Sequence, residues 1–198
     1  ITTRFTTTML LKSIINNLPK QYRFLKVSSL CADSREIIQG CLFFALKGKQ
    51  FNGEKFIKEA EKRGAKAIIC GKSVKIQCKI PVIKVDDPRQ LLSKACSNFY
   101  PDKPKNIIAV TGTNGKSSVA DFFYQILNNN NIPVASIGTL GIKKKNNIKK
   151  IKLTTLDIIS LHKELYQLKK LKINNVIVEA SSHGLKQGRL NDIEFKAG

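Results

Sequence analysis

The sequence predicts an α/β protein built from two parts, a small N-terminal α/β domain at residues 1–104 and the start of a phosphate-loop (P-loop), parallel-sheet ATPase domain at residues 105–198. Three observations predict this class. Short apolar runs alternate with helix-periodic segments in both parts. A glycine-rich loop at residues 110–118 lies between a strand-like run and a helix. Tyr100–Lys105 holds two prolines and several charges without an apolar period, which is typical of a linker.

The N-terminal part shows alternating helix and strand signals. The expected elements are a helix at Met9–Leu18, a strand at Leu42–Leu46, a helix at Lys55–Arg63, and strands at Ala67–Cys70 and Val82–Val85. A further helix is expected from Asp87 as N-cap and Pro88 as first helical residue through Phe99. Met9 is the only methionine, so residues 1–8 are either part of the fold or upstream translation.

The second part continues the alternation with longer helices. The expected elements are a strand at 107–111, a helix at 117–128, a strand at Val134–Ile137, a helix at Ile158–Leu171, and strands at Val176–Val178 and around Ile193–Phe195. Strands that alternate with long helices indicate a parallel sheet with helices on its faces. Three or four strands are few for such a sheet, so we expect this domain to be incomplete.

Composition limits the classes of partner. A chain of 198 residues with 42% hydrophobic content can bury a core, but a formal charge of +21 is unusual. The charge fits nucleic-acid binding or a lysine-rich surface that serves anionic small molecules. The one dense cluster is Lys143–Lys152, with six lysines in ten residues, expected as a solvated hairpin or loop. Since no RNA-binding or helix-turn-helix pattern accompanies it, we predict small-molecule substrates and no specific nucleic acid.

The five cysteines show no two-residue spacing of a zinc or redox motif. Cys31 and Cys70 lie in or beside apolar runs and are expected as buried thiols, which fits a reducing cytoplasm. No stretch approaches the roughly 18–20 apolar residues of a membrane span. The N-terminus lacks the core of a signal peptide. The prediction is therefore a cytoplasmic protein with no membrane partner.

The loop Val-Thr-Gly-Thr-Asn-Gly-Lys-Ser-Ser at residues 110–118 predicts a nucleotide site. Gly112 and Gly115 let backbone N–H groups approach phosphate oxygens, and the following helix directs its positive end at the same anion. Lys116 would reach the β- and γ-phosphates and Ser117 would ligate magnesium. The two glycines are three positions apart rather than the usual five, so an ordinary helix start is the alternative.

Three loops should meet at the carboxyl edge of the second sheet: the P-loop, Gly138–Gly141 and Glu179–Leu185. Glu179 ends an apolar strand, where a carboxylate is costly unless it is paired or bound to a metal. A magnesium ion shared with Ser117 would remove that cost, and a capping or salt-bridged glutamate is the alternative. His183 alone would be structural, but its serine-rich loop makes it a candidate site residue.

Several sequence blocks together resemble the Mur ligases of peptidoglycan synthesis, over about residues 10–198. These blocks are Thr111–Ser117, Ile137–Gly141, Thr154–Asp157 and Glu179–Leu185, with Ala32–Arg35, Gly40–Gly48 and Asn52–Gly53 in the N-terminal part. The Ser-Ser-His-Gly-Leu run points to the branch that adds the third residue of the stem peptide. Jointly these motifs are specific, although each alone is not.

The resemblance implies three sets of binding residues. Those for the uridine end of UDP-N-acetylmuramoyl-L-alanyl-D-glutamate are Ala32, Ser34, Lys49, Gln50 and Phe51. Those for ATP are Gly112, Thr113, Asn114, Gly115, Lys116, Ser117 and Ser118. Those for the muramoyl substrate are Thr154, Thr155, Ser181, Gln187 and Arg189.

It also implies a reaction. ATP phosphorylates the D-glutamate side-chain carboxylate, and the amine of meso-diaminopimelate or L-lysine attacks the acyl phosphate to give an amide. Lys116, Glu179 and His183 are the expected catalytic residues, Ser117 and Glu179 the expected Mg²⁺ ligands, and Arg189 a further cation for the developing charge. The family's C-terminal domain and modified lysine are absent from this sequence, so we expect it to bind substrates without turnover. We also expect a monomer.

The sequence departs from the family at three places. Leu156 replaces a usual Pro, Ser117-Ser118 replace Thr-Thr, and Asn52–Glu54 replaces Asp-Gly-His, which weakens the inference on the uridine contact. Two alternatives remain open. One is a sister ligase, such as the enzyme that adds D-Ala-D-Ala, or a folylpolyglutamate synthase. The other is a non-catalytic nucleotide or polyanion binder, which would lose affinity steeply with salt.

Overall fold

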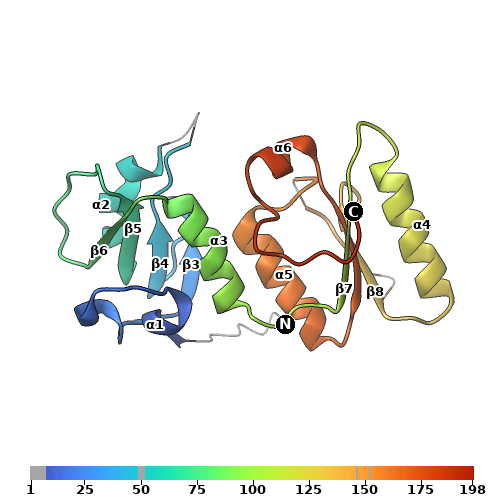
Figure 1. Ribbon diagram of the computed structural model, residues 1–198, viewed down its shortest axis with the longest axis horizontal. Coiled ribbons are helices and arrows are strands. Elements are labelled where there is room, and N and C mark those ends of the chain that lie inside the picture. The colour runs from blue at the N-terminus through green and yellow to red at the C-terminus, as the bar shows by residue number, and fades with distance from the viewer. Residues whose placement is uncertain (1–7, 49–51, 146, 152) are drawn as a thin grey trace. The chain divides into compact units, whose positions relative to one another are not determined.

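The computed structural model forms two compact units, the first ending at Phe99 and the second beginning at Tyr100 (Figure 1). It describes residues 8–48, 52–145, 147–151 and 153–198. Within these stretches, none of the helices has the length and apolar character needed to cross a bilayer. Each unit is described separately below.

The first unit is built around a four-stranded parallel sheet of order β3-β4-β5-β6. Its strands are β3 (Ser29–Cys31), β4 (Cys41–Phe44), β5 (Ala67–Gly71) and β6 (Val82–Val85). Its α-helices are α1 (Leu11–Ile14), α2 (Ile57–Lys62) and α3 (Pro88–Phe99), and short 3₁₀ turns lie at Lys20–Tyr22, Ser34–Glu36 and Gly53–Phe56. A separate antiparallel pair joins β1 (Met9–Leu10) to β2 (Lys26–Val27).

Burial on both faces explains why β4 and β5 are continuous apolar runs. Phe43 and Ile68 pack in one cluster with Ile57 of α2. The alternate residues of the two strands lie on the other face of the sheet, and α3 contacts both strands. Helices on both faces therefore cover this sheet, as the sequence predicts for an α/β domain.

The predicted ends of two helices in this unit had different outcomes. The Asp87 carboxylate accepts bonds from Arg89 N and Gln90 N at 2.9 and 3.0 Å, which confirms the predicted N-cap of α3. The helix expected at Met9–Leu18 is wrong in extent, because only Leu11–Ile14 is helical. Met9 and Leu10 pair with β2 instead, a tertiary contact that overrides helical periodicity. Strand β3 was not predicted.

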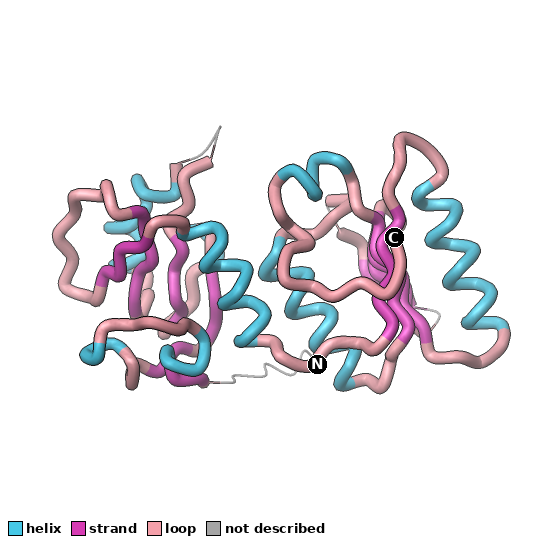
Figure 2. Tube along the Cα trace, viewed as in Figure 1, coloured by secondary structure: helices cyan, strands magenta, loops and turns pink. Residues whose placement is uncertain are grey.

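The second unit holds a five-stranded sheet of order β10-β9-β8-β11-β7. Figure 2 shows this sheet nearly edge-on, with helices on both sides. Its strands are β7 (Asn106–Val110), β8 (Val134–Gly138), β9 (Gly141–Lys144), β10 (Asn147–Lys149) and β11 (Asn175–Glu179). Strands β7, β11 and β8 are parallel, and β9 and β10 add an antiparallel hairpin. Helix α4 (Lys116–Asn129) lies on one face, with α5 (Ile158–Lys170) and α6 (Ser182–Lys186) on the opposite side (Figure 1).

The core of this unit lies between the sheet and α5. Leu161, Leu165 and Leu168 have helical spacing and pack with Ile107, Ile137 and Val178 from three strands. The Asp157 side chain accepts a bond from Ser160 N at 3.0 Å and caps α5. Leu156, which stands where the family usually has Pro, is half-buried against this core.

Strands β9 and β10 place Lys143, Lys144 and Lys149 of the lysine cluster in a hairpin, which was one of the two predicted forms. Lys152 lies outside the described residues. Lys143 pairs with Asp121 of α4, and Lys144 and Lys149 both pair with Glu164 of α5 at 3.2 and 3.4 Å. Glu164 is buried, so two lysines offset one carboxylate that would otherwise be costly. Part of the positive charge of this hairpin is therefore used inside the unit.

The strand expected around Ile193–Phe195 is wrong in position. Ile193 and Phe195 pack into the core cluster instead. Pairing with the edge of β7 begins just afterwards, where Lys196 N donates to Ile107 O at 2.8 Å and Ala109 N to Ala197 O at 3.0 Å. This parallel bridge extends the sheet beyond β7.

Candidate nucleotide and substrate site

The P-loop connects the end of β7 to the start of α4, as the sequence predicts. Gly112 and Gly115 have φ values of +138° and +81°, in the region that favours glycine. A Cβ on Gly115 would meet no atom within 4 Å, so the requirement for glycine there is conformational rather than steric. The loop is exposed along Thr111–Gly115.

Lys116 lies over this loop. Its ammonium donates to Gly112 O at 2.7 Å and lies 3.4 Å from Thr113 O. The first N–H groups of α4 have no helical acceptors, because the first such bond runs from Val119 N to Gly115 O. Unpaired N–H groups, a helix N-terminus and a lysine therefore converge on one exposed loop, an arrangement suited to phosphate.

Glu179 is the buried centre of the adjoining region. It ends β11 with an exposed fraction of 1%. Its carboxylate accepts bonds from Ser117 Oγ, Thr139 N and Thr139 Oγ1, each at 3.0 Å. These described donors are all neutral, so they orient the carboxylate without offsetting its charge.

Gly138 makes room for this carboxylate. A Cβ on Gly138 would stand 2.1 Å from Glu179 Oε1 and 2.4 Å from its Cδ. Any larger residue would displace the glutamate side chain, since both groups are buried and close-packed. Gly138 and Thr139 were placed in a convergent loop by sequence, but their role toward Glu179 was not predicted.

The donor set of Ser117 and Glu179 fits a magnesium ion. Mg²⁺ prefers oxygen ligands and is commonly held by one or two carboxylates, together with substrate phosphates and water. The part of the chain that the structure describes holds no group of three or more His, Cys, Asp or Glu side chains that would suit a metal such as zinc. One buried carboxylate and one hydroxyl beside a P-loop match the oxygen ligands that Mg²⁺ prefers.

The residues expected to bind the muramoyl substrate lie together beside this carboxylate. Thr155 Oγ1 donates to Glu179 O at 2.9 Å and lies 3.0 Å from Ser181 Oγ. Arg189 Nη1 donates to Thr155 O at 2.7 Å, and Arg189 Nε to Gln187 Oε1 at 2.9 Å. Thr154 Oγ1 lies 3.1 Å from Thr139 Oγ1. Segments from residues 154 to 189 thus form one hydrogen-bonded group.

His183 belongs to the outer end of that group. It is exposed on α6, and its Nε2 lies 2.8 Å from Gln187 Nε2. Because the amide nitrogen of Gln187 is the donor, His183 Nε2 is the acceptor. No hydrogen bond among the described residues joins His183 to Glu179, so the structure does not bring these two predicted catalytic residues into direct contact.

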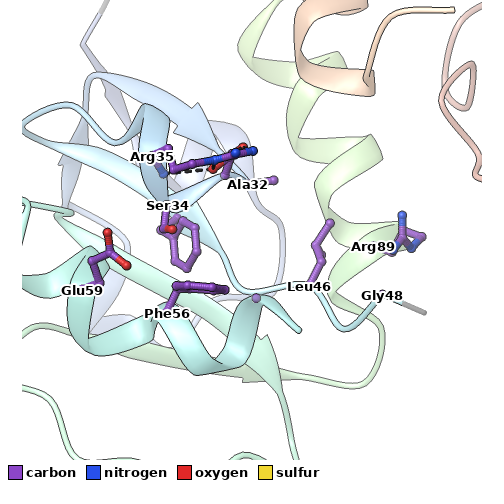
Figure 3. A pocket seen from close by; sticks show the side chains of 11 residues that line it. Ala32, Ser34, Arg35, Leu46, Gly48, Phe56, Glu59 and Arg89 are labelled. Atoms are coloured by element: carbon purple, nitrogen blue, oxygen red, sulfur yellow. Dashed lines mark hydrogen bonds and ion pairs between the residues drawn. The ribbon is translucent and has the colours of Figure 1, made fainter. Parts of the chain in front are cut away.

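The first unit contains a separate cavity of about 520 Å³ (Figure 3). Its lining residues are Ala32, Asp33, Ser34, Arg35, Phe43, Leu46, Gly48, Gly53, Phe56, Glu59 and Arg89. Two of the five residues expected to bind the uridine end, Ala32 and Ser34, lie here. The other three, Lys49, Gln50 and Phe51, lie outside the described residues. The phenyl rings of Phe43 and Phe56 were not predicted to line this site.

The edge of this cavity is fixed by local polar contacts. Arg35 pairs with Asp33 at 2.6 Å, and the hydrogen bond from Arg35 lowers the pKa of the Asp33 carboxyl. Asn52 Oδ1 accepts from Glu54 N at 3.0 Å. A Cβ on Gly53 would lie 2.8 Å from Leu46 O, so close backbone approach requires glycine at this position.

Comparison with known families matches both units. A model of "Mur ligase family, catalytic domain" matches residues 26–100, and a model of "Mur ligase middle domain" matches residues 110–198. A protein of Brucella melitensis named UDP-N-acetylmuramoyl-L-alanyl-D-glutamate--2,6-diaminopimelate ligase is 42% identical over 94% of this chain and 38% of its own length. A Rickettsia montanensis protein of the same name is 40% identical over 90% of this chain and 38% of its own length.

Solved structures agree. A structure described as this same diaminopimelate ligase has a TM-score of 0.80 and 30% identity over 96% of this chain and 40% of its own. A MurF ligase from Thermotoga maritima in complex with ADP has a TM-score of 0.51 at 21% identity, which supports the fold alone. The present chain therefore spans less than half the length of these relatives.

Proposed function

The chain belongs to the Mur ligase family, and from that premise we propose that it is part of an ATP-dependent ligase that joins 2,6-diaminopimelate to UDP-N-acetylmuramoyl-L-alanyl-D-glutamate. The observation that carries the proposal is the buried Glu179 carboxylate, held beside Ser117 at the foot of a P-loop. A sequence identity of 42% to a relative with this name supports the same reaction.

In the proposed reaction, a phosphoryl group passes from ATP to the side-chain carboxylate of D-glutamate, and the amine of the diamino acid then displaces phosphate to form the amide. Gly112–Ser118 would bind the ATP phosphates through backbone N–H groups and Lys116. Ser117 and Glu179 would hold Mg²⁺, which neutralises charge that develops during phosphoryl transfer.

The group around Thr155 would orient the muramoyl substrate. Arg189 and Lys116 are the cations suited to the carboxylate and to the transferred phosphoryl group. Arg189 is held by Thr155 O and Gln187 Oε1, which limits the positions of its guanidinium. His183 would act from the outer end through Gln187 rather than at the Glu179 carboxylate.

The cavity of the first unit would bind the uridine end of the same substrate. Ser34 is buried at its wall with an exposed fraction of 6%, while Phe56 is 39% exposed and presents a ring on which a base can stack. The local pattern Asn52–Glu54 differs from the family's, but Asn52 supplies a turn that closes this side.

Three finer points belong to the proposal. Diaminopimelate is proposed over L-lysine because the relatives compared above are named for it. We expect a cytoplasmic monomer that acts on small molecules and not on nucleic acid or membranes. Since the chain spans 38% of the Brucella melitensis relative, binding rather than turnover is the property expected of this chain alone.

Calorimetric titration tests the proposal. The chain is titrated with UDP-N-acetylmuramoyl-L-alanyl-D-glutamate and then with Mg-ATP, at low and high salt. Saturable binding that tolerates salt and is weakened in Ser34→Ala or Arg189→Ala would support the ligase. If neither the dipeptide nucleotide nor Mg-ATP binds, and RNA binds tightly with an affinity that falls steeply with salt, the polyanion alternative suggested by the net charge of +21 is favoured.

A further inference from the structure

The hydroxyl of Thr155 has no hydrogen-bonding capacity left for a substrate. Its single hydroxyl proton is donated to Glu179 O at 2.9 Å. The same oxygen accepts from Ser181 N at 2.9 Å and lies 3.0 Å from Ser181 Oγ, which must therefore be the donor of that bond. One donor and two acceptor sites are all that a threonine hydroxyl offers.

Burial leads to the same conclusion. Thr155 is 1% exposed, so a bound molecule would not reach its side chain without a rearrangement. The rest of the side chain packs against Gly184, where a Cβ would lie 2.8 Å from Thr155 Cγ2. Ser181 Oγ continues the network by accepting from Gly184 N at 3.1 Å and so caps α6.

Thr154 provides a contrast one residue earlier in the chain. It is only partly buried, and its hydroxyl lies 3.1 Å from Thr139 Oγ1, the group that holds the Glu179 carboxylate. The two adjacent threonines are thus joined to different parts of Glu179. Thr155 bonds its main-chain oxygen, and Thr154 is linked to its carboxylate through Thr139.

We propose that Thr155 is a positioning residue whose hydroxyl fixes the turn from Glu179 to Ser181, and so sets the proposed magnesium-binding carboxylate and the substrate loop together, without itself contacting substrate. The proposal rests on the proposed function and deepens it. The family resemblance implies that both threonines lie at the muramoyl substrate, and the proposal assigns the Thr155 hydroxyl to the turn rather than to the substrate.

The physical reason is that this turn needs a fixed partner at both ends. Glu179 O and Ser181 N point toward the same hydroxyl, which closes the turn as a backbone hydrogen bond would. Arg189 binds Thr155 O at 2.7 Å, so the cation expected at the substrate is anchored to the same residue. Loss of the hydroxyl would release the main chain on both sides of Ala180 and leave Glu179 O and Ser181 N without this partner.

The test compares Thr155→Val with Thr155→Ser, which keeps the hydroxyl, and with Thr154→Val, which makes the same chemical change at the neighbouring residue. Amide hydrogen exchange at Ser181 is measured by NMR in the chain without ligand. Affinities for Mg-ATP and for UDP-N-acetylmuramoyl-L-alanyl-D-glutamate are measured by calorimetry, and thermal unfolding shows whether each variant remains folded.

We expect exchange at Ser181 to quicken about tenfold or more in Thr155→Val, and to stay within about threefold of wild type in Thr155→Ser and Thr154→Val. We also expect Thr155→Val to weaken Mg-ATP binding about tenfold, with Thr155→Ser restoring most of it. Loss of Mg-ATP affinity separates this role from direct substrate contact, which would weaken only the dipeptide nucleotide.

Two results would overturn the proposal. One is unchanged Ser181 exchange in Thr155→Val. The other is a loss confined to the dipeptide nucleotide, which would assign Thr155 to substrate contact. If wild type itself fails to bind Mg-ATP, the proposed function fails. The hold of Thr155 on the turn is then still decided by Ser181 exchange, which is measured without ligand, so the two failures are distinguishable.

Discussion

The P-loop and the region around Glu179 are neighbours that are built in opposite ways. Thr111–Gly115 is exposed, and its glycines are needed for left-handed backbone conformations. Glu179 and Thr155 are each 1% exposed, and Gly138 is needed because its neighbour fills the space where a Cβ would lie. Ser117, which donates to the Glu179 carboxylate at 3.0 Å, links the two regions through its side chain.

The contrast separates binding from pre-organisation. The P-loop offers N–H groups and a lysine to an incoming anion, so its residues should affect affinity more than stability. The groups of the buried region already form hydrogen bonds with one another, so substitutions there should affect both ligand affinity and the stability of the fold. A site of this kind places one carboxylate with fixed geometry beside an exposed loop that is open to its ligand.

The largest effect is expected when glycine is replaced in the buried region. Gly138→Ala should lower the free energy of unfolding by about 2–4 kcal/mol, because the new Cβ would stand 2.1 Å from Glu179 Oε1. Gly115→Ala should cost only about 1–2 kcal/mol, since its φ of +81° is strained for alanine but the space is open. Urea unfolding of the two variants tests this prediction. An equal loss of unfolding free energy in Gly138→Ala and Gly115→Ala would contradict the difference between the two regions.

Acid should reveal a second buried group. Burial lowers the pKa of His162 to about 4, and its Nδ1 has no hydrogen-bond partner among the described residues. The unfolded chain binds this proton near pH 6.5 and the folded chain only near pH 4. Stability attributable to His162 is therefore lost as pH falls through that window, by roughly 2–3 kcal/mol at pH 4.5.

Urea unfolding at pH 7 and pH 4.5, in wild type and in His162→Phe, isolates this contribution. The variant is less stable at neutral pH if its packing suffers, but it should lose less stability on acidification than wild type does. Parallel losses in the two proteins would contradict the assignment of this acid effect to His162. Asp121 and Asp102 should contribute little at pH 4.5, because Lys143 and Lys170 lower the pKa of their carboxyl groups and both remain ionised there.

In the P-loop, Lys116→Ala should weaken ATP binding about 10- to 100-fold, because a charge-assisted contact to phosphate is lost. Its unfolding free energy should change by less than about 0.5 kcal/mol, since the ammonium is bonded only to carbonyls of its own loop. Lys163→Ala, at an exposed position on α5, is the matched control for loss of one positive charge. A similar loss of affinity in both would indicate general attraction to polyanions.

The smallest effect is expected at a helix end outside both regions. Asp157→Ala should lower stability by about 1 kcal/mol by removing the N-cap bond to Ser160 N. Asp157→Asn should keep most of this stability, because asparagine caps helices equally well. Thermal unfolding would contradict the capping role if both variants were destabilised alike.

Sequence alone was informative where chemistry is local. The P-loop, the cap at Asp87 and the parallel strands β7, β8 and β11 were all predicted, because each depends on neighbouring residues or on burial pattern. The lysine hairpin was one of two forms considered. The placement of Glu179 at the carboxyl edge followed from the strand preceding it.

Long-range contacts account for what was missed. Helix α1 is short because β1 pairs with β2, and Ile193 is a core residue rather than part of a strand. The bond from Thr139 to Glu179 joins residues 40 positions apart, and those of Thr155 span 24 and 26. Spacing along the chain carries no signal for such pairs, although their position directly after strands indicates which loops to examine.

The most direct test of the account is calorimetric titration of the chain with ATP, with and without Mg²⁺, in wild type and in Glu179→Gln. If the buried carboxylate is the magnesium ligand, wild type should bind ATP more tightly when Mg²⁺ is present. The variant should stay folded and lose that dependence, with Mg-ATP affinity reduced about tenfold or more. Equal affinity of the two proteins for Mg-ATP, or no effect of Mg²⁺ on wild type, would contradict the assignment of Glu179.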